Sequence, residues 1–134
     1  MTPEKTLEDL IAAWIARETG EPESRPSLDD DPNWWAFGTM WEIQRRNPEF
    51  CLDIIVQIMN RSSDEWVLGA LSAGPLEGVL AMHGEKIIDR VEELAEKDAK
   101  FRGLFAGVWR NGMTDDIWRR VEALRKRAKN EHRD

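Results

Sequence analysis

The chain has 134 residues, 41% of them hydrophobic and 34% charged, with a formal net charge of −7 at pH 7. This composition excludes a disordered or fibrous chain, and the length fits a single domain that can bury a sizeable core. The acidity disfavours nucleic acid as a partner, no apolar run approaches the roughly 20 residues of a membrane span, and the single cysteine, Cys51, excludes an internal disulfide and indicates a reducing cytoplasm.

The N-terminal third is expected to hold two helices separated by an acidic loop. Apolar residues at helical spacing predict the first helix from about Thr6 to Arg17. The segment 18–32 combines glycine and three prolines with a run of acids, a composition typical of a loop. We expect Asp31 to cap the next helix, over residues 34–46.

Cap and breaker residues divide the middle of the chain. Asn47 is expected to begin an isoleucine-rich helix, and a capping-box pattern at residues 62–65 begins another. The Gly-Pro pair at 74–75 ends that helix and begins a third, which Gly84 is expected to stop after His83.

The C-terminal part is expected to form three more helices. Apolar residues recur at helical spacing over 85–97, and Asp98 is expected to cap the helix that follows. Asn111 and Gly112 break that helix, and Thr114 caps a final one that contains a basic tail. No segment alternates apolar and polar residues as a strand would. The sequence therefore predicts an all-α fold of about eight short helices.

Two stretches of the chain read alike at a separation of 51 residues. Such recurrence is typical of stacked helical units. We expect two three-helix units, about residues 34–73 and 85–130, in a HEAT-like helical repeat packed as a single globular domain of residues 1–134. The matched pairs are Phe50 with Phe101, Asn60 with Asn111, Ser63 with Thr114, Asp64 with Asp115 and, one position late, Trp66 with Trp118.

Four short motifs stand in order along the chain. They are Ala73-Gly74-Pro75-Leu76-Glu77, Arg90-Val91-Glu92, Phe101-Arg102 and Gly107-Val108-Trp109. On these motifs, the stretch from about residue 34 to residue 120 resembles an uncharacterised bacterial domain family of unknown function. The resemblance implies a small helical bacterial protein, and it brings with it no activity and no catalytic residue.

Seven tryptophans in a chain without tyrosine are candidates for a binding surface. Trp34 and Trp41 share one face of their expected helix, whereas Trp35 points about 100° away, so at least one of the three should be exposed. An exposed tryptophan is a typical interface anchor. The ordinary alternative is that tryptophans fill the spaces between short helices.

These residues predict a module that acts by binding another protein. The acidic composition suits a basic partner, as it would for an immunity protein or an antitoxin-like inhibitor of a toxin or nuclease. In this hypothesis an aromatic anchor is combined with an acidic rim. The partner-binding residues would be Trp34, Trp35 and Trp41 with Asp29, Asp30 and Asp31.

Carboxylates offer an alternative of another class, a small-molecule-binding protein or an enzyme with an interhelical pocket. The candidates for that pocket are Glu42, Glu77 and Glu92, together with Asp53. For Glu77 the ordinary alternative is a first-turn acid that the helix dipole stabilises. No metal-ligand spacing, phosphate loop or nucleophile–base grouping is present, so the sequence favours no metal, cofactor or dedicated enzyme activity.

The basic tail is the candidate for a nucleic-acid contact. Residues 117–134 carry seven bases and three acids. These bases could bind the phosphate groups of a nucleic acid. The ordinary alternative is that basic residues towards a helix C-terminus complement the helix dipole and keep the surface solvated.

Overall fold

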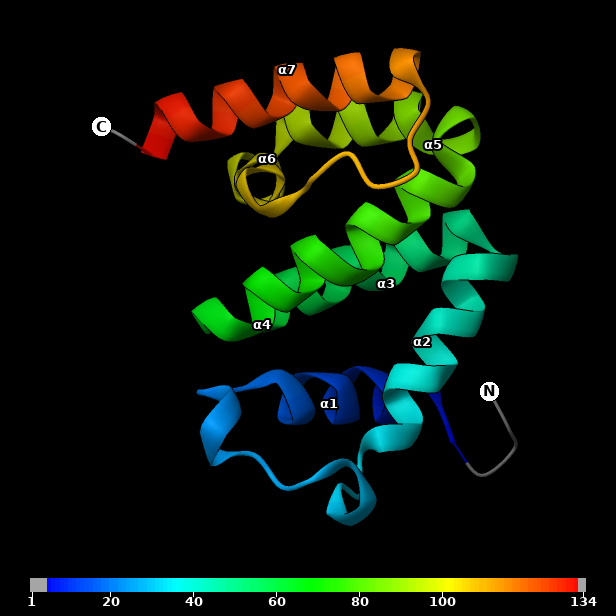
Figure 1. Cartoon of the computed structure of the whole chain (residues 1–134), viewed down its shortest axis with the longest axis vertical. Coiled ribbons are helices and arrows are strands. Elements are labelled where there is room, and N and C mark those ends of the chain that lie inside the picture. Colours follow the sequence, from blue (N-terminus) through cyan, green and yellow to red (C-terminus); the bar gives the residue numbers. More distant parts are fainter. Residues whose placement is uncertain (1–4, 133–134) are drawn as a thin grey trace.

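The structure, a computed structural model, describes residues 5–132. Within this range the chain forms seven α-helices, which are linked by loops and by short 3₁₀ and π turns (Figure 1). No strand occurs in this range, so the predicted all-α class is confirmed. The count is one lower than expected because α5 contains two of the predicted helices, which are joined at a kink at His83. Their bounds are α1 Leu7–Glu18, α2 Trp34–Arg46, α3 Pro48–Arg61, α4 Glu65–Leu71, α5 Glu77–Lys97, α6 Ala99–Gly103 and α7 Asp115–His132.

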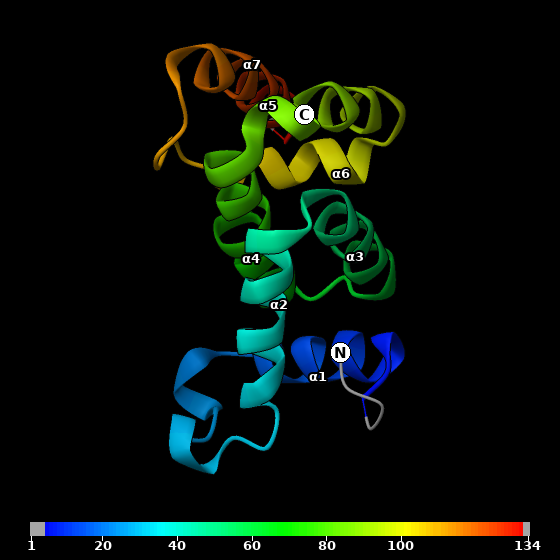
Figure 2. The same ribbon diagram turned by 90° about the vertical axis from the view of Figure 1, so that its right-hand side faces the viewer.

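The helices stack in three levels along the long axis of the molecule (Figure 1 and Figure 2). α1 lies at one end, α3 and α4 lie in the middle, and α6, α7 and the second half of α5 lie at the other end. α2 contacts both α1 and α3, and α5 joins the middle level to the far end. The buried apolar residues form one cluster that runs through all three levels, so the described chain is a single domain.

The acidic segment between α1 and α2 is held in place by Arg25. The segment forms two 3₁₀ turns, Pro22–Ser24 and Leu28–Asp30. The guanidinium of Arg25 donates to the carbonyl oxygens of Glu18 and Gly20 at 2.8 and 2.7 Å, and it pairs with the Glu18 carboxylate at 3.2 Å. The predicted loop is therefore a folded connection that one side chain ties to the end of α1.

Most of the predicted helix starts are confirmed by side-chain caps. Asn47, Asp98 and Thr114 accept hydrogen bonds from backbone N–H groups in the first turns of α3, α6 and α7. In α4 the cap is Asp64 rather than the predicted Ser62, because the Asp64 carboxylate accepts from two N–H groups of the first turn. These contacts are local, which is why the sequence could indicate them.

α4, the π turn Ser72–Leu76 and α5 form one long, bent rod. Pro75 lacks an N–H group, and its ring crowds the carbonyl four residues earlier, so the helical register widens there. The predicted break beside Gly84 is present, because α5 consists of two helical parts that meet at a kink at His83, whose φ of −135° and ψ of 27° are not helical. The His83 Nε2 atom donates to the carbonyl oxygen of Arg45 at 2.7 Å and pins the kink to the end of α2.

The described residues show no internal repeat. α3 has 14 residues, whereas its expected counterpart α6 has five. Asn60 lies inside α3, but its match Asn111 lies in a turn with a φ of +48°. Residues that match in sequence therefore serve different local structures at these positions.

Candidate binding groove

A hollow of about 550 Å³ lies between α1, α2 and the rod of α4 and α5. α1 contributes Trp14 and Glu18, and α2 contributes an apolar wall that includes Met40. Asn111 and Gly112, in the loop before α7, close one end. All three levels of the fold therefore contribute to this site.

Small residues form the floor of the hollow. Ala70, Gly74, Gly78 and Ala81 lie along the rod where it faces α2. A Cβ atom on Gly78 would come within 2.1 Å of the Nε2 atom of Gln44. The absence of a side chain at Gly78 thus allows the Gln44 amide to lie directly against the backbone of α5.

Gln44 is a buried polar group inside this mostly apolar hollow. It is 7% exposed, and its Nε2 atom contacts the Sδ atom of Met82 at 3.9 Å. A thioether sulfur is a weak acceptor, and no hydrogen bond in the described part of the chain reaches the Oε1 atom of Gln44. The Oε1 atom is not itself buried, so it faces the hollow with capacity to accept a hydrogen bond from a polar group of a ligand.

Large apolar side chains stand exposed around the hollow. Phe37, Trp41 and Met82 are 43, 44 and 45% exposed, and all three line it. Trp34 extends this surface, because its ring stacks on Phe37 with centroids 5.0 Å apart. Arg17 covers the stacked pair, with its guanidinium 4.9 and 5.0 Å from the two rings. Contiguous exposed apolar surface of this kind is typical of an interaction site.

A second hollow of about 590 Å³ continues from the first. Both are lined by Glu18 and Ala70, so they meet at the end of α1. The second hollow extends to Pro22 on one side and to Glu65 and Trp66, at the start of α4, on the other. We call the two hollows together the α1–α4 groove.

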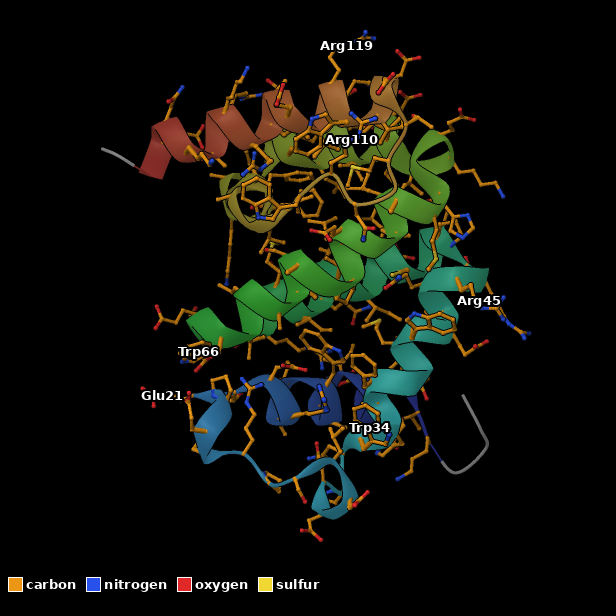
Figure 3. The ribbon with its side chains drawn as sticks, in the orientation of Figure 1. Glu21, Trp34, Arg45, Trp66, Arg110 and Arg119 are labelled. Carbon is orange, nitrogen blue, oxygen red and sulfur yellow. The ribbon has the colours of Figure 1, made fainter. Side chains whose placement is uncertain are left out.

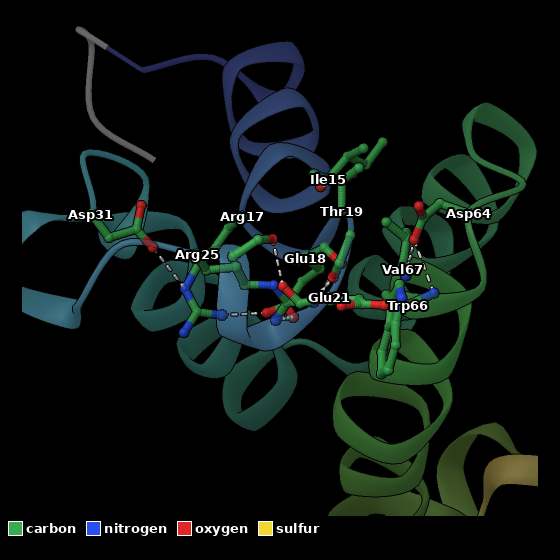
Figure 4. A network of polar contacts seen from close by, with 12 residues as sticks. Ile15, Arg17, Glu18, Thr19, Glu21, Arg25, Asp31, Asp64, Trp66 and Val67 are labelled. Carbon is green, nitrogen blue, oxygen red and sulfur yellow. Dashed lines mark hydrogen bonds and ion pairs between the residues drawn. The ribbon is translucent and has the colours of Figure 1, made fainter.

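Glu18, where the two hollows meet, carries a neutralised charge. Its carboxylate pairs with Arg17 and with Arg25, and Arg17 pairs in turn with Asp31 at 3.3 Å (Figure 4). A carboxylate this deeply buried requires such partners. The network fixes the walls of the groove and leaves no free acid at its centre.

Free acids lie instead at the end of the groove near Trp66. Among residues 5–132, no ion pair involves Glu21, Glu23 or Glu65. Figure 3 and Figure 4 both place Glu21 near Trp66. The α1–α4 groove therefore has an apolar part around Trp41 and an acidic part around Trp66.

The three predicted tryptophans have separate surroundings. Trp34 and Trp41 are exposed on one face of α2, as their spacing predicted, and Trp41 lines the groove. Trp35 is half-buried against the core, with the Nζ atom of Lys5 4.8 Å from its ring. The structure brings Trp34 and Trp41 to the same side of the molecule through Phe37, and Trp35 lies apart from them.

The three predicted aspartates also lie in different surroundings. Asp29 and Asp30 lie exposed on the 3₁₀ turn before α2. Asp31 pairs with Arg17, and its carboxylate accepts a hydrogen bond from the backbone N–H of Asn33 at 2.8 Å. It therefore shapes the turn ahead of α2 and does not cap the helix, because α2 begins only at Trp34.

The carboxylates expected in a pocket serve as structural contacts outside the hollows. Glu42 pairs with arginines on its own helix, Glu92 pairs with Arg120, and Asp53 pairs with Arg90. Within the described residues, no three His, Cys, Asp or Glu side chains are grouped to hold a metal ion, and no helix is long and apolar enough to cross a membrane.

Glu77 has an indirect role at the groove. Its carboxylate accepts hydrogen bonds from the backbone N–H of Trp109 at 2.8 Å and from the Nδ2 atom of Asn111 at 3.2 Å. It thereby fixes the loop whose residue Asn111 lines the first hollow. Two of the four sequence motifs meet in this contact, since Glu77 ends one and Trp109 ends another.

The sequence interpretation missed Phe37, Gln44 and Met82 as site residues. Phe37 could have been found, because it falls between Trp34 and Trp41 on one helical face. Gln44 and Met82 carried no such signal, because their meeting depends on the packing of α2 against α5.

One comparison with known proteins gave a match. The family described as "Family of unknown function (DUF6869)" matches residues 23–129, which include the residues of the α1–α4 groove except for Trp14, Glu18 and Pro22. We found no match among curated proteins or among solved structures.

Proposed function

The chain belongs to the family of unknown function DUF6869, and we propose that it is a binding module whose α1–α4 groove receives an apolar, basic segment of another protein. The observation that carries the proposal is the exposure of Phe37, Trp41 and Met82 around a hollow of about 550 Å³. Large side chains of this kind, set beside a concave surface, are typical anchors of protein interfaces.

The charge of the groove supports a basic partner. Glu21 and Glu65 have no ion-pair partner in the described chain and lie at the end near Trp66. Acids at the rim of an interface speed the approach of a basic partner and set its orientation more than they set affinity. The net charge of −7 acts in the same direction.

A narrower form of this proposal is inhibition of a basic toxin or nuclease by an immunity-like protein in the cytoplasm. Its support is the net charge and the free, buried thiol of Cys51, which suits a reducing compartment. The HEAT-like duplication is likewise a proposal, supported by the shared order of α2, α3 and α4 with the second half of α5, α6 and α7.

Selection of peptides on the immobilised full chain tests the main proposal. We expect enrichment of peptides that combine a large apolar residue with lysine or arginine. The double substitution Trp41→Ala and Met82→Ala should weaken binding of a selected peptide by about tenfold or more, since anchor residues carry most of the binding free energy. Leu28→Ala is the matched control, because Leu28 is also a large exposed apolar residue, more exposed than Trp41 and Met82, but lies outside the groove. Equal affinity for the double variant would contradict the proposal.

A small molecule in the first hollow is the second candidate. The volume of about 550 Å³ falls within the range of ligand pockets, about 300–1,000 Å³. The specific observation in its favour is Gln44, whose amide offers a buried polar contact among apolar walls. Thermal-shift screening of metabolites with the wild-type chain and Gln44→Leu would distinguish it, because only a ligand that uses the amide loses its effect in the variant.

A further inference from the structure

The basic face of α7 is largely neutralised by the protein itself. Arg119 pairs with Asp116, Arg120 with Glu92 and Asp89, Lys126 with Glu122, and Arg127 with Glu96. No ion pair in the described chain involves Arg125 or Lys129. An extended polyanion would need several free bases in a row, so this arrangement favours a single anionic group.

Arg125 is a buried cation with an unused hydrogen-bonding edge. It is 7% exposed, and its Nε and Nη2 atoms are buried without a hydrogen-bond partner in the described structure. These two N–H groups point the same way along one edge of the guanidinium, the arrangement that binds two oxygens of a carboxylate or phosphate. Leaving such donors unpaired costs stability, and a ligand that pairs them would recover it.

Two tryptophan rings lie beside the guanidinium. The Arg125 Cζ atom is 4.0 Å from the ring centroid of Trp109 and 5.7 Å from that of Trp118. Cation–π contacts stabilise the charge but accept no conventional hydrogen bond, so the Nε and Nη2 groups stay unpaired. Trp109 is 60% exposed, and the Nζ atom of Lys129 lies 5.8 Å from the same ring. A second cation therefore stands beside the exposed indole.

We propose that Arg125, Lys129 and Trp109 form a site for a phosphate monoester of a small molecule. The Nε and Nη2 groups of Arg125 would each donate to one phosphate oxygen, and Lys129 would offset the second negative charge of the dianion. The exposed indole of Trp109 would turn aside to admit the phosphate to the buried Nε and Nη2 groups, after which it can stack on an aromatic ring of the ligand. Two cations favour a phosphate dianion over a carboxylate. The site is separate from the α1–α4 groove, so it does not depend on the function proposed there.

Titration of the isotope-labelled full chain, followed by NMR, tests this site. The probes are inorganic phosphate, phenyl phosphate and benzoate, each added at constant ionic strength. We expect saturable shifts of the Arg125 Nε–H and Trp109 indole signals, with phenyl phosphate binding most tightly and benzoate most weakly. No saturable shift with either phosphate, or benzoate binding as tightly as phenyl phosphate, overturns the proposal.

Two substitutions at Arg125 distinguish the contribution of its paired N–H donors from that of its positive charge. Arg125→Gln should weaken phenyl phosphate binding by about tenfold or more, and Arg125→Lys should also weaken it, because lysine lacks the paired donors. Arg119→Gln is the control and should bind as the wild type, since Arg119 is exposed and paired with Asp116. If Arg125→Gln does not fold, Arg125→Lys and Trp109→Ala provide the test. Unchanged affinity in the folded Arg125 variants overturns the proposal.

Discussion

Cys51 shows what burial does to a side chain in this protein. It is fully buried, and burial raises the pKa of its thiol to about 12. The reactive thiolate is therefore scarce at neutral and mildly alkaline pH, even though Cys51 lies near the start of α3, where the helix dipole would favour it. This agrees with the structural role that its apolar neighbours indicate.

We predict that Cys51 in the folded chain reacts with a disulfide reagent only when the core opens. Its labelling should be at least about a hundredfold slower than in the denatured chain, which serves as the control. Because the folded thiol has the higher pKa, its contribution to the free energy of unfolding should fall as the pH rises from 9.0 towards about 12. Labelling as fast as in denaturant would contradict the assignment.

The residues of the groove could be predicted only in part. Trp34 and Trp41 share a helix face because of spacing within α2, and that is visible in the sequence. The partners that make them a site, Gln44 beside Gly78 and Met82, come together through packing of α2 on the rod. Such contacts depend on the distance and angle between helices, and one sequence does not contain that information.

At the scale of elements, the bend in α5 follows from close packing against α7. A Cβ atom on Gly84 would lie 2.8 Å from the Cγ2 atom of Ile117, a stiff and buried side chain. Glycine is therefore needed here for the close approach of two helices. The sequence predicted a helix break here because a glycine after His83 is a helix-ending signal, and the kink at His83 agrees with it.

Gly84→Ala should destabilise the protein by about 1–3 kcal/mol, because the new methyl group overlaps Ile117 in a packed core. Gly38→Ala is the matched control. Gly38 lies inside α2 with open space around it, so alanine there should stabilise the protein by about 0.5–1 kcal/mol through helix propensity. Chemical denaturation measures the change in the free energy of unfolding of each variant. An increase for Gly84→Ala would contradict the packing argument.

The fold itself was more predictable at helix starts than at helix ends. The side chains of Asn47, Asp98 and Thr114 accept hydrogen bonds from backbone N–H groups two or three residues further along the chain, so their effect is local. The continuity of the rod through Pro75 is not local. Packing of the π turn against α2 and α3 supports the helix there, where the local signals alone would end it.

At the scale of the whole molecule, charge and apolar surface are arranged in relation to the groove. Most arginines of the described chain form ion pairs, and several of these pairs join neighbouring helices, such as Arg61 with Glu8 and Arg120 with Glu92. The acids left without partners include Glu21 and Glu65 beside Trp66. Under the proposed function, these two acids would orient a basic partner at that end of the groove.

The most direct test of the groove as a binding site is to map a selected peptide onto the labelled full chain by NMR. We predict the largest shifts at the Trp41 indole, the Met82 methyl group and the Gln44 side-chain amide, which line the first hollow. Trp109 lies outside the groove and should keep its signal, so it serves as the internal reference. Shifts that centre on Trp109, or that leave Gln44 and Trp41 unchanged, would contradict the account.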